Sequence, residues 1–423
     1  MSEIAVSNTF GLLLLDVGFL IVITLFVAYF FKKIGIPAVM GILIGGILIG
    51  FNESYRSFLF NTELESFRLL ITELAIGYIA YDIGNEIDLR IWKDKTVRYL
   101  AIIISETTIP FLFVTLTFLL VFKFNLGISI IIGAIAMTSA PVLTSEILGD
   151  YHTNEELNQV VLFLLAFDSV LSILVINIGV TIVTVPALSV NLVESIIILL
   201  LQKLGISLAL SCLGSLFILY MVNRKHLEER SLLEWILGVS LVILGITLTL
   251  NGSVILTMMF FGVILKTLEN RYEILTEHIL QIEILMVPVV LMFYIIMGLS
   301  IDVLYSLGAG LVFIVSYVVL RGIGKISGTL LPTRSSSLPG NIKNNLHYFL
   351  ITQGGIAIAL AGLAYNQLIT LNLQEEATSI ITIIGVGVII SELIGPLLLR
   401  FGIIKTQNGT LLSNHNQAEE TNN

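Results

Sequence analysis

The chain has 423 residues, of which 56% are hydrophobic and only 12% are charged, and its formal net charge is −9. A soluble protein typically carries about 25% charged residues, so this composition excludes an ordinary soluble domain and favours a membrane protein. No basic stripe points to a nucleic-acid partner, and the single cysteine, Cys212, excludes a disulfide framework. The five histidines lack the spacing of metal ligands, and we expect no cofactor.

Apolar blocks recur along the chain at the length that a helix needs to cross a bilayer, roughly 17–25 residues. They predict an all-α polytopic membrane protein with thirteen transmembrane helices. The first block lacks a preceding basic region and a cleavage site, so we expect a retained span rather than a signal peptide. The predicted spans are residues 9–31, 36–51, 67–88, 97–122, 126–148, 157–184, 192–222, 232–250, 252–268, 281–301, 308–331, 346–366 and 377–400.

The Lys and Arg residues are unevenly distributed over the loops. The side reached after the first span holds 15 of them, and the other side holds three, Arg56, Arg68 and Lys123. Basic loops are retained on the cytoplasmic side of a membrane. We therefore expect a multi-pass protein of the cell membrane with its N-terminus outside and its C-terminus in the cytoplasm. The polar residues 404–423 are predicted to form a disordered cytoplasmic tail.

An internal repeat relates the two halves of the chain. Gly84, near the end of the third span, precedes Gly298 in the tenth by 214 residues, and the same offset separates Thr138 from Thr352. Spans one to six then repeat as spans eight to thirteen, with the seventh as a linker helix. Because equivalent helices are seven spans apart, the two repeats of six are inverted, as in many secondary transporters. Chance similarity between Gly-rich apolar helices is the alternative.

Two spans that correspond under this repeat contain residues that interrupt a helix. The fifth span carries Thr138, Ser139 and Pro141, and a proline in mid-span removes a backbone donor and clashes with the preceding turn. The twelfth span carries Gly354 and Gly355, and glycines also weaken a helix. Matched broken helices indicate a transport site, because their ends and unwound carbonyls can bind an ion. Kinks used only for packing are the alternative.

Asp168, Arg321 and Lys325 are charged residues inside long apolar spans. Asp168, in the sixth span, would cost roughly 2.5–3.5 kcal/mol at the bilayer centre on insertion scales, so it is expected to mark an ion or proton path. In the eleventh span, Arg321 and Lys325 lie one helical turn apart on one face. For these two bases the alternative is that they extend to the inner membrane surface, since the span ends near residue 331.

Taken together, these segments resemble the monovalent cation:proton antiporter superfamily. The likeness is closest to its second branch, the thirteen-helix bacterial and archaeal sodium–proton and potassium–proton antiporters, and it runs from about residue 10 to 403. The motifs that carry it are the segment from Gly35 to Gly50, the runs from Gly84 to Asp88 and from Gly298 to Asp302, the break from Thr138 to Pro141, Asp168 and the pair Gly324-Lys325.

The resemblance implies two domains. A core ion-transport domain would comprise residues 67–184 and 281–403, and a dimerisation or scaffold domain would comprise residues 1–51 and 192–268. The two broken helices would cross in the core, and the core would slide against the scaffold to give alternating access. The resemblance also implies a homodimer embedded in the lipid bilayer.

The resemblance assigns roles to the site residues as well. Asp168 matches the aspartate of the family that binds the ion or the proton, and Lys325 matches the lysine that faces it in electrogenic members. With Asp168 in this role, Thr138, Ser139 and Ser169 would supply further oxygen ligands for the monovalent cation.

The chain departs from the family pattern at Phe167, where relatives have Asp or Asn, and often Gln in the potassium branch. In electrogenic members a carboxylate at this position pairs with the lysine, and Phe can neither accept that pair nor titrate. Lys325, if buried, then needs another partner or must lose its proton, because removal from water disfavours the charged form. The candidate acids are Asp82, Glu106, Glu146 and Glu392. For each acid the alternative is a solvated or pore-lining group without a direct role.

The sequence therefore predicts a secondary antiporter that exchanges Na⁺, or alternatively K⁺ or Li⁺, for protons. Competition between the cation and the proton for Asp168 would couple the two fluxes. Because Phe167 removes one titratable group, electroneutral exchange is favoured. A cation channel or leak pathway on the same scaffold and a transport-inactive sensor subunit are the alternatives. No nucleophile–base pair supports an enzyme.

Overall fold

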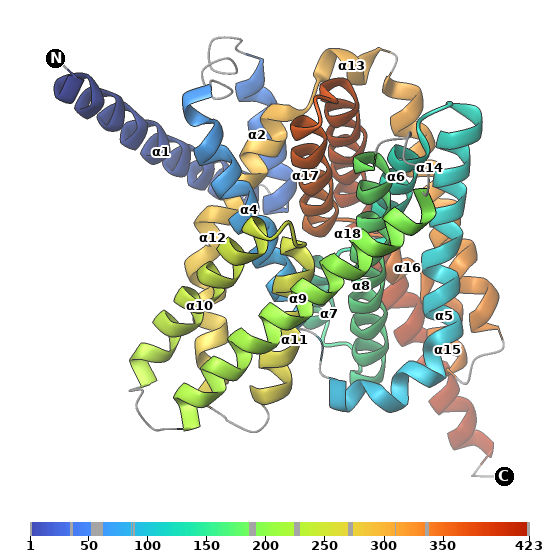
Figure 1. The fold of residues 1–423 in the computed structure, drawn as a ribbon. Coiled ribbons are helices and arrows are strands. Elements are labelled where there is room, and N and C mark those ends of the chain that lie inside the picture. Colours follow the sequence, from blue (N-terminus) through green and yellow to red (C-terminus); the bar gives the residue numbers. More distant parts are fainter. Residues whose placement is uncertain are drawn as a thin grey trace.

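The computed structural model describes residues 2–33, 37–51, 62–85, 87, 89–185, 192–223, 229–269, 274–308, 310–334 and 338–420. Every regular element among them is helical, which confirms the predicted all-α class (Figure 1). The helices are α1 (Ser2–Lys33), α2 (Ala38–Gly50), α4 (Thr62–Asn85), α5 (Leu89–Leu116), the π-helix η1 (Thr117–Val121), α6 (Leu126–Met137), α7 (Pro141–Asp150), α8 (Glu155–Thr184), α9 (Leu192–Asn223), α10 (Glu229–Thr249), α11 (Val254–Glu269), α12 (Ile274–Ser300), α13 (Val303–Leu307), α14 (Gly310–Thr333), α15 (Gly340–Asn345), α16 (His347–Leu350), α17 (Gly355–Thr370) and α18 (Gln374–Glu420).

Each predicted span overlaps one of these helices or a pair of them. By length and apolar composition, eight helical segments among the described residues can cross a membrane, and three shorter helices are apolar as well. The number of thirteen crossings stays a prediction. Four residues of the motifs and span ends quoted above, Gly35, Ile36, Glu86 and Asp88, lie outside the described residues.

Helix α18 extends beyond the last predicted span. It continues to Glu420, so residues 404–420 are helical here, where their polar composition predicts a disordered tail. The segment after Pro396 contains no further proline, and a helix that has already formed adds residues without a new nucleation cost.

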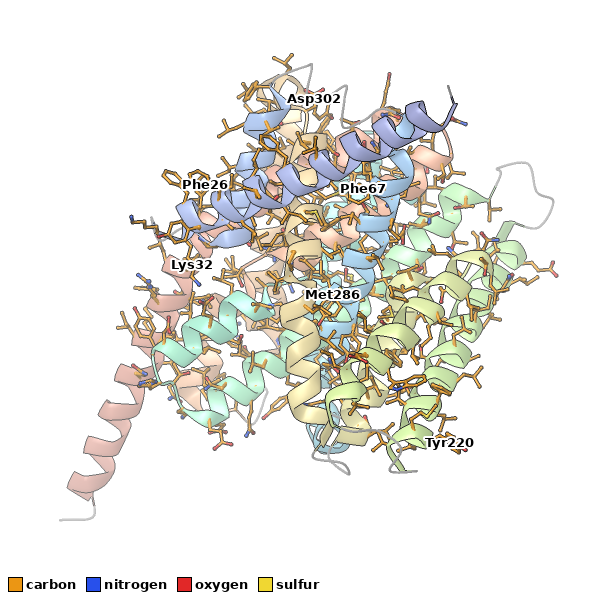
Figure 2. All side chains as sticks on the ribbon, turned by 90° about the vertical axis from the view of Figure 1, so that its left-hand side faces the viewer. Phe26, Lys32, Phe67, Tyr220, Met286 and Asp302 are labelled. Carbon is orange, nitrogen blue, oxygen red and sulfur yellow. The ribbon has the colours of Figure 1, made fainter. Side chains whose placement is uncertain are left out.

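The helices form one bundle with apolar side chains on its outside. In Figure 1, α10 and α11 lie on one side and α5 and α14 on the opposite side, with α17 and α18 between them, and α9 runs diagonally across the view. Figure 2 shows α1 crossing in front of the other helices, with Phe26 and Lys32 toward its C-terminal end. Leu15 and Phe26 of this helix are 70% and 68% exposed. Apolar surface of this extent indicates contact with lipid or another chain rather than with water.

Two close helix contacts reproduce the internal repeat. Helix α4 packs against α11, and α2 packs against α12. A Cβ atom added to Gly46 or Gly298 would lie 2.5 Å from a backbone oxygen of the facing helix, and one added to Gly84 or Gly262 would lie closer still. Gly84 corresponds to Gly298 at the offset of 214 residues, and Gly46 falls close to the equivalent of Gly262, at an offset of 216. The two halves therefore use the same kind of glycine contact twice, as repeated units should.

The breaks in the two matched spans are present. Helix α6 ends at Met137 and α7 begins at Pro141, so the fifth span is divided by three non-helical residues. Helix α16 ends at Leu350 and α17 begins at Gly355, which divides the twelfth span. Pro141 stands in the first turn of its helix, where a missing N–H costs nothing.

Candidate ion-binding site

The two broken helices lie against each other at their breaks. The Ser139 hydroxyl donates to the carbonyl oxygen of Leu350 at 2.9 Å. In the other direction, the Gln353 amide donates to the carbonyl oxygen of Ile135 at 3.0 Å. These bonds join residues more than 200 positions apart in the sequence. Ser139, a predicted ion ligand, thus uses its hydroxyl hydrogen to hold the second break in place.

Arg321 binds the carbonyl groups at both breaks. Its Nη1 atom donates to Ile351 O at 2.5 Å, and its Nη2 atom donates to Thr138 O at 2.6 Å and to Thr352 O at 3.0 Å. These carbonyls follow the C-terminal ends of α6 and α16, which carry partial negative charge and lack partners within the helix. Arg321 is 2% exposed, so its guanidinium group neutralises both helix ends inside the protein.

Lys325 is shared by two buried carboxylates. Its Nζ atom lies 2.6 Å from Glu106 Oε2 and 3.0 Å from Asp168 Oδ2, and all three side chains are 0% exposed. The acids come from different helices, Glu106 from α5 and Asp168 from α8, while Lys325 lies on α14. Among the candidate acids, the structure therefore brings Glu106 to the lysine.

Glycines on α14 allow this arrangement. A Cβ atom added to Gly324 would lie 2.5 Å from the Cα atom of Pro110, and one added to Gly328 would lie 2.6 Å from the carbonyl oxygen of Ser105. Helix α14 thus lies directly on the backbone of α5 on both sides of Lys325. A larger residue at either glycine would push the helices apart and separate Lys325 from the α5 acid.

The remaining carboxylate oxygens have different surroundings. The Ser169 hydroxyl lies 3.2 Å from Asp168 Oδ1 and 2.9 Å from the carbonyl oxygen of Leu165. Glu106 Oε1 is buried and has no hydrogen-bond partner among the described residues. A buried polar atom without a partner carries a desolvation cost of about 1–3 kcal/mol. This oxygen is therefore a place where a bound proton or cation would be stabilising.

Phe167 is not part of the charged group. Its ring packs on Phe163 with 4.8 Å between centroids, and it contacts an apolar cluster of α5, α8 and the C-terminal helices. Successive residues on a helix point about 100° apart, so Phe167 can pack with apolar side chains while Asp168 faces α14. The Phe167 side chain therefore stabilises helix packing.

Sequence reasoning missed the functional contacts of Tyr317 and Gln353. The Gln353 amide donates to the Tyr317 hydroxyl at 2.7 Å, and both side chains are 0% exposed. Tyr317, Arg321 and Lys325 follow one another at intervals of four residues on α14. That spacing places all three on one helix face, and it is the signal that could have identified Tyr317.

The other acids line a separate cavity of about 350 Å³. Asp82, Glu146 and Glu392 contribute to its wall, together with Pro141 and Gly355, the first residues of α7 and α17. Gly354 also lines it. The cavity thus lies at the N-terminal ends of α7 and α17. Arg321, by contrast, binds carbonyl groups at the C-terminal ends of α6 and α16.

Comparisons with known proteins bear on the family and the fold of the chain. A family model described as "sodium/hydrogen exchanger, transmembrane" matches residues 21–401. The structure of the sodium proton antiporter MjNhaP1 from Methanocaldococcus jannaschii at pH 8 is similar, with a TM-score of 0.70 and 15% identity over 92% of this chain and 98% of that one. An electron-microscopy map of the same antiporter is also similar, with a TM-score of 0.66 and 15% identity over 94% of this chain and 97% of that one. Among curated sequences, none matches this chain. At this identity the likeness to the solved structures shows the fold.

Proposed function

This chain belongs to the sodium/hydrogen exchanger family, and from that membership we propose that it is a secondary antiporter that exchanges a monovalent cation for protons. The observation that carries the proposal is the enclosed lysine of α14, shared by Asp168 and Glu106 beside two broken helices. Na⁺ is the first cation to test, because the antiporter with the same fold is described as a sodium proton antiporter. K⁺ and Li⁺ are the others.

Competition for Asp168 provides the coupling in this proposal. The carboxylate is a hard oxygen ligand when ionised and a neutral group when protonated, so it holds either a cation or a proton. A cation at Asp168 must displace Lys325, which lies at 3.0 Å. Glu106, at 2.6 Å, then keeps the displaced ammonium group paired inside the protein. The hydroxyl groups of Ser169 and Thr138 would complete the oxygen ligands.

The charges of the site bear on the stoichiometry. With Asp168 and Glu106 ionised and with Lys325 and Arg321 protonated, the four formal charges cancel. One bound cation or one bound proton gives the same total charge. Glu106, however, supplies a second carboxylate that Phe167 cannot, so the premise of a single titratable acid no longer holds. Electroneutral exchange stays a prediction, and flux at an imposed voltage tests it.

The domain roles follow from the same proposal. Residues 67–184 and 281–403 would move as the core, and residues 1–51 and 192–268 would form a scaffold through which two copies dimerise. The chain would lie in the cell membrane with its C-terminus in the cytoplasm. The exposed apolar side chains of α1 support contact between this helix and lipid or a second copy.

Asp168→Asn tests the proposed function. We expect this variant to lose cation-dependent proton movement in proteoliposomes, measured as dissipation of a pH gradient by Na⁺, K⁺ or Li⁺. Asp150→Asn is the matched control, because Asp150 is exposed at the end of α7. Normal exchange by Asp168→Asn would rule out the site. Uncoupled, conductive flux in the wild type would indicate a channel, and cation binding without flux would indicate a sensor.

A further inference from the structure

Glu392 is a buried carboxyl group that the exchange at Asp168 does not use. It lies on α18, is 3% exposed and lines the 350 Å³ cavity. Its Oε2 atom has no hydrogen-bond partner among the described residues. Buried polar atoms in native proteins are nearly always satisfied by protein, water or a bound ion. An unpartnered carboxylate oxygen at a cavity wall therefore points to a ligand in the cavity.

The other side of this carboxyl group is held by the protein. The backbone N–H of Met40 donates to the group. A Cβ atom added to Gly354 would lie 3.2 Å from Oε1, so this oxygen sits at the start of α17. The N-terminal end of a helix carries partial positive charge and stabilises an anion. Oε1 thus lies at the N-terminal end of α17, while Oε2 is left without a hydrogen-bond partner among the described residues.

The groups that face Glu392 supply further oxygen atoms. Asp82 comes from α4 and the Tyr294 hydroxyl from α12, and both line the cavity. Tyr294 lies within electrostatic range of both acids. Glu146, on α7, is exposed at the rim, and Tyr78 of α4 is the remaining titratable group on the wall. No Lys, Arg or His occurs among the described residues that line the cavity. Such a wall attracts cations and repels anions.

We propose that Glu392, with Asp82 and the Tyr294 hydroxyl, forms a second binding position for a monovalent cation, from which the cation passes to Asp168. This inference rests on the proposed function, because only a transported cation has to travel between the two positions. Pro37, which follows the first span, lines the same cavity. By the distribution of basic loops, the cavity is on the cytoplasmic side, so this position loads the cytoplasmic cation.

Equilibrium binding of radiolabelled Na⁺ to the purified full-length protein tests the proposal. Asp168→Asn removes the central position, and we expect this variant to retain a weaker, saturable binding of Na⁺. Adding Glu392→Gln should weaken that residual binding by roughly tenfold or more, as expected for loss of a charged ligand. Adding Glu376→Gln instead should not change it, because Glu376 is exposed in the first turn of the same helix, 16 residues before Glu392. Absence of residual binding, or binding that survives Glu392→Gln, would overturn the proposal.

Transport by single variants gives a second measurement. For Glu392→Gln we expect the KM for cytoplasmic Na⁺ to rise roughly tenfold with little change in kcat, since the chemistry at Asp168 is intact. If that variant does not fold, Tyr294→Phe keeps the ring and removes only the hydroxyl, and its KM should rise by roughly threefold. An unchanged KM in the variants that fold contradicts the second position. Failure of Asp168→Asn to stop exchange would instead contradict the proposed function.

Discussion

Lys325 is the residue whose surroundings decide how the site works. An ammonium group has three N–H donors, and inside the protein it is stable only with charged or polar partners. Glu106 and Asp168 both accept from it. One acid can therefore be released for transport while the other keeps the lysine paired. In the proposed exchange, Glu106 thus supplies the second acid that Phe167 cannot.

Glu106→Gln should weaken cation binding at the site. Without the Glu106 charge, Lys325 binds Asp168 more strongly, and an incoming cation has to compete with that pair. We expect the KM for Na⁺ to rise by roughly tenfold, which corresponds to about 1.4 kcal/mol. Sodium-dependent pH-gradient dissipation measures it. Glu106→Asp retains a carboxylate and should show a smaller effect, and a KM equal to that of the wild type would refute the role of Glu106.

The sequence was sufficient to identify the charged residues of the site, but not which acid pairs with Lys325. An intramembrane Asp168 and Lys325 are visible because charge is costly in an apolar span. Glu106 was one of four candidate acids, and the choice depends on how closely α14 approaches α5. That distance follows from Gly324 and Gly328 meeting backbone atoms, which a single sequence does not reveal.

At the scale of the elements, one face of α14 organises the two broken helices. Tyr317, Arg321 and Lys325 bind, in order, the Gln353 amide, the carbonyl groups at both breaks, and the two carboxylates. Each unsatisfied buried carbonyl would cost about 1–3 kcal/mol. The unwound segments are therefore stable in an apolar environment because a neighbouring helix supplies the donors that water would otherwise provide.

Arg321→Lys tests this arrangement. A lysine keeps the positive charge but lacks the planar guanidinium fork that reaches carbonyls of both breaks. We expect a lower Tm and an exchange rate reduced by roughly tenfold or more, because at least one carbonyl loses its donor. Thermal unfolding and proteoliposome exchange provide the two measurements. Arg400→Lys, at an exposed position of α18, is the control. Equal Tm and rate in both variants would show that the breaks do not depend on Arg321.

The positions of the helix breaks could be predicted from the sequence. The side chains that hydrogen-bond to the broken segments could not. Pro141 and the Gly354-Gly355 pair interrupt helices for local reasons that a sequence contains. The bonds of Arg321 and Gln353 join segments far apart in the chain, so they depend on tertiary packing. The end of α18 could not be predicted from composition, because its polar residues predict a disordered tail, whereas the helix continues to Glu420.

At the scale of the whole molecule, two glycine contacts join the proposed core to the proposed scaffold. Gly84 of α4 meets Gly262 of α11, and Gly298 of α12 meets Gly46 of α2. Each contact pairs one helix of the proposed core with one of the proposed scaffold. At both contacts the two backbones approach each other directly at the glycines, which suits a sliding movement between the two parts.

Gly262→Ala should therefore impair exchange without changing the site. Its Cβ atom would clash with the carbonyl oxygen of Tyr81, and overpacking of this kind typically costs about 1–3 kcal/mol. We expect a slower exchange rate, while equilibrium binding of Na⁺ stays close to that of the wild type. Gly245→Ala is the control, since nothing lies within 4 Å of that position. An unchanged exchange rate in Gly262→Ala would argue against movement at this contact.

The class of the protein and its inverted repeat could be predicted because both depend on sequence patterns that recur along the whole chain. Hydropathy gave the spans, and the constant offset between Gly84 and Gly298 gave the repeat. The pairing of α4 with α11 and of α2 with α12 could not be predicted in this way. Apolar spans carry little information on which neighbour each one contacts.

The bonds of α14 have a final consequence for how the protein fluctuates. They tie α5, α6, α8 and the segment between α16 and α17 to one helix, so none of these segments can open far without breaking charged or buried bonds in the others. Cooperative units of this kind open together or not at all. The region proposed to bind the ion is therefore expected to be among the slowest to open. Local fluctuations would be concentrated in peripheral helices such as α1 and α10.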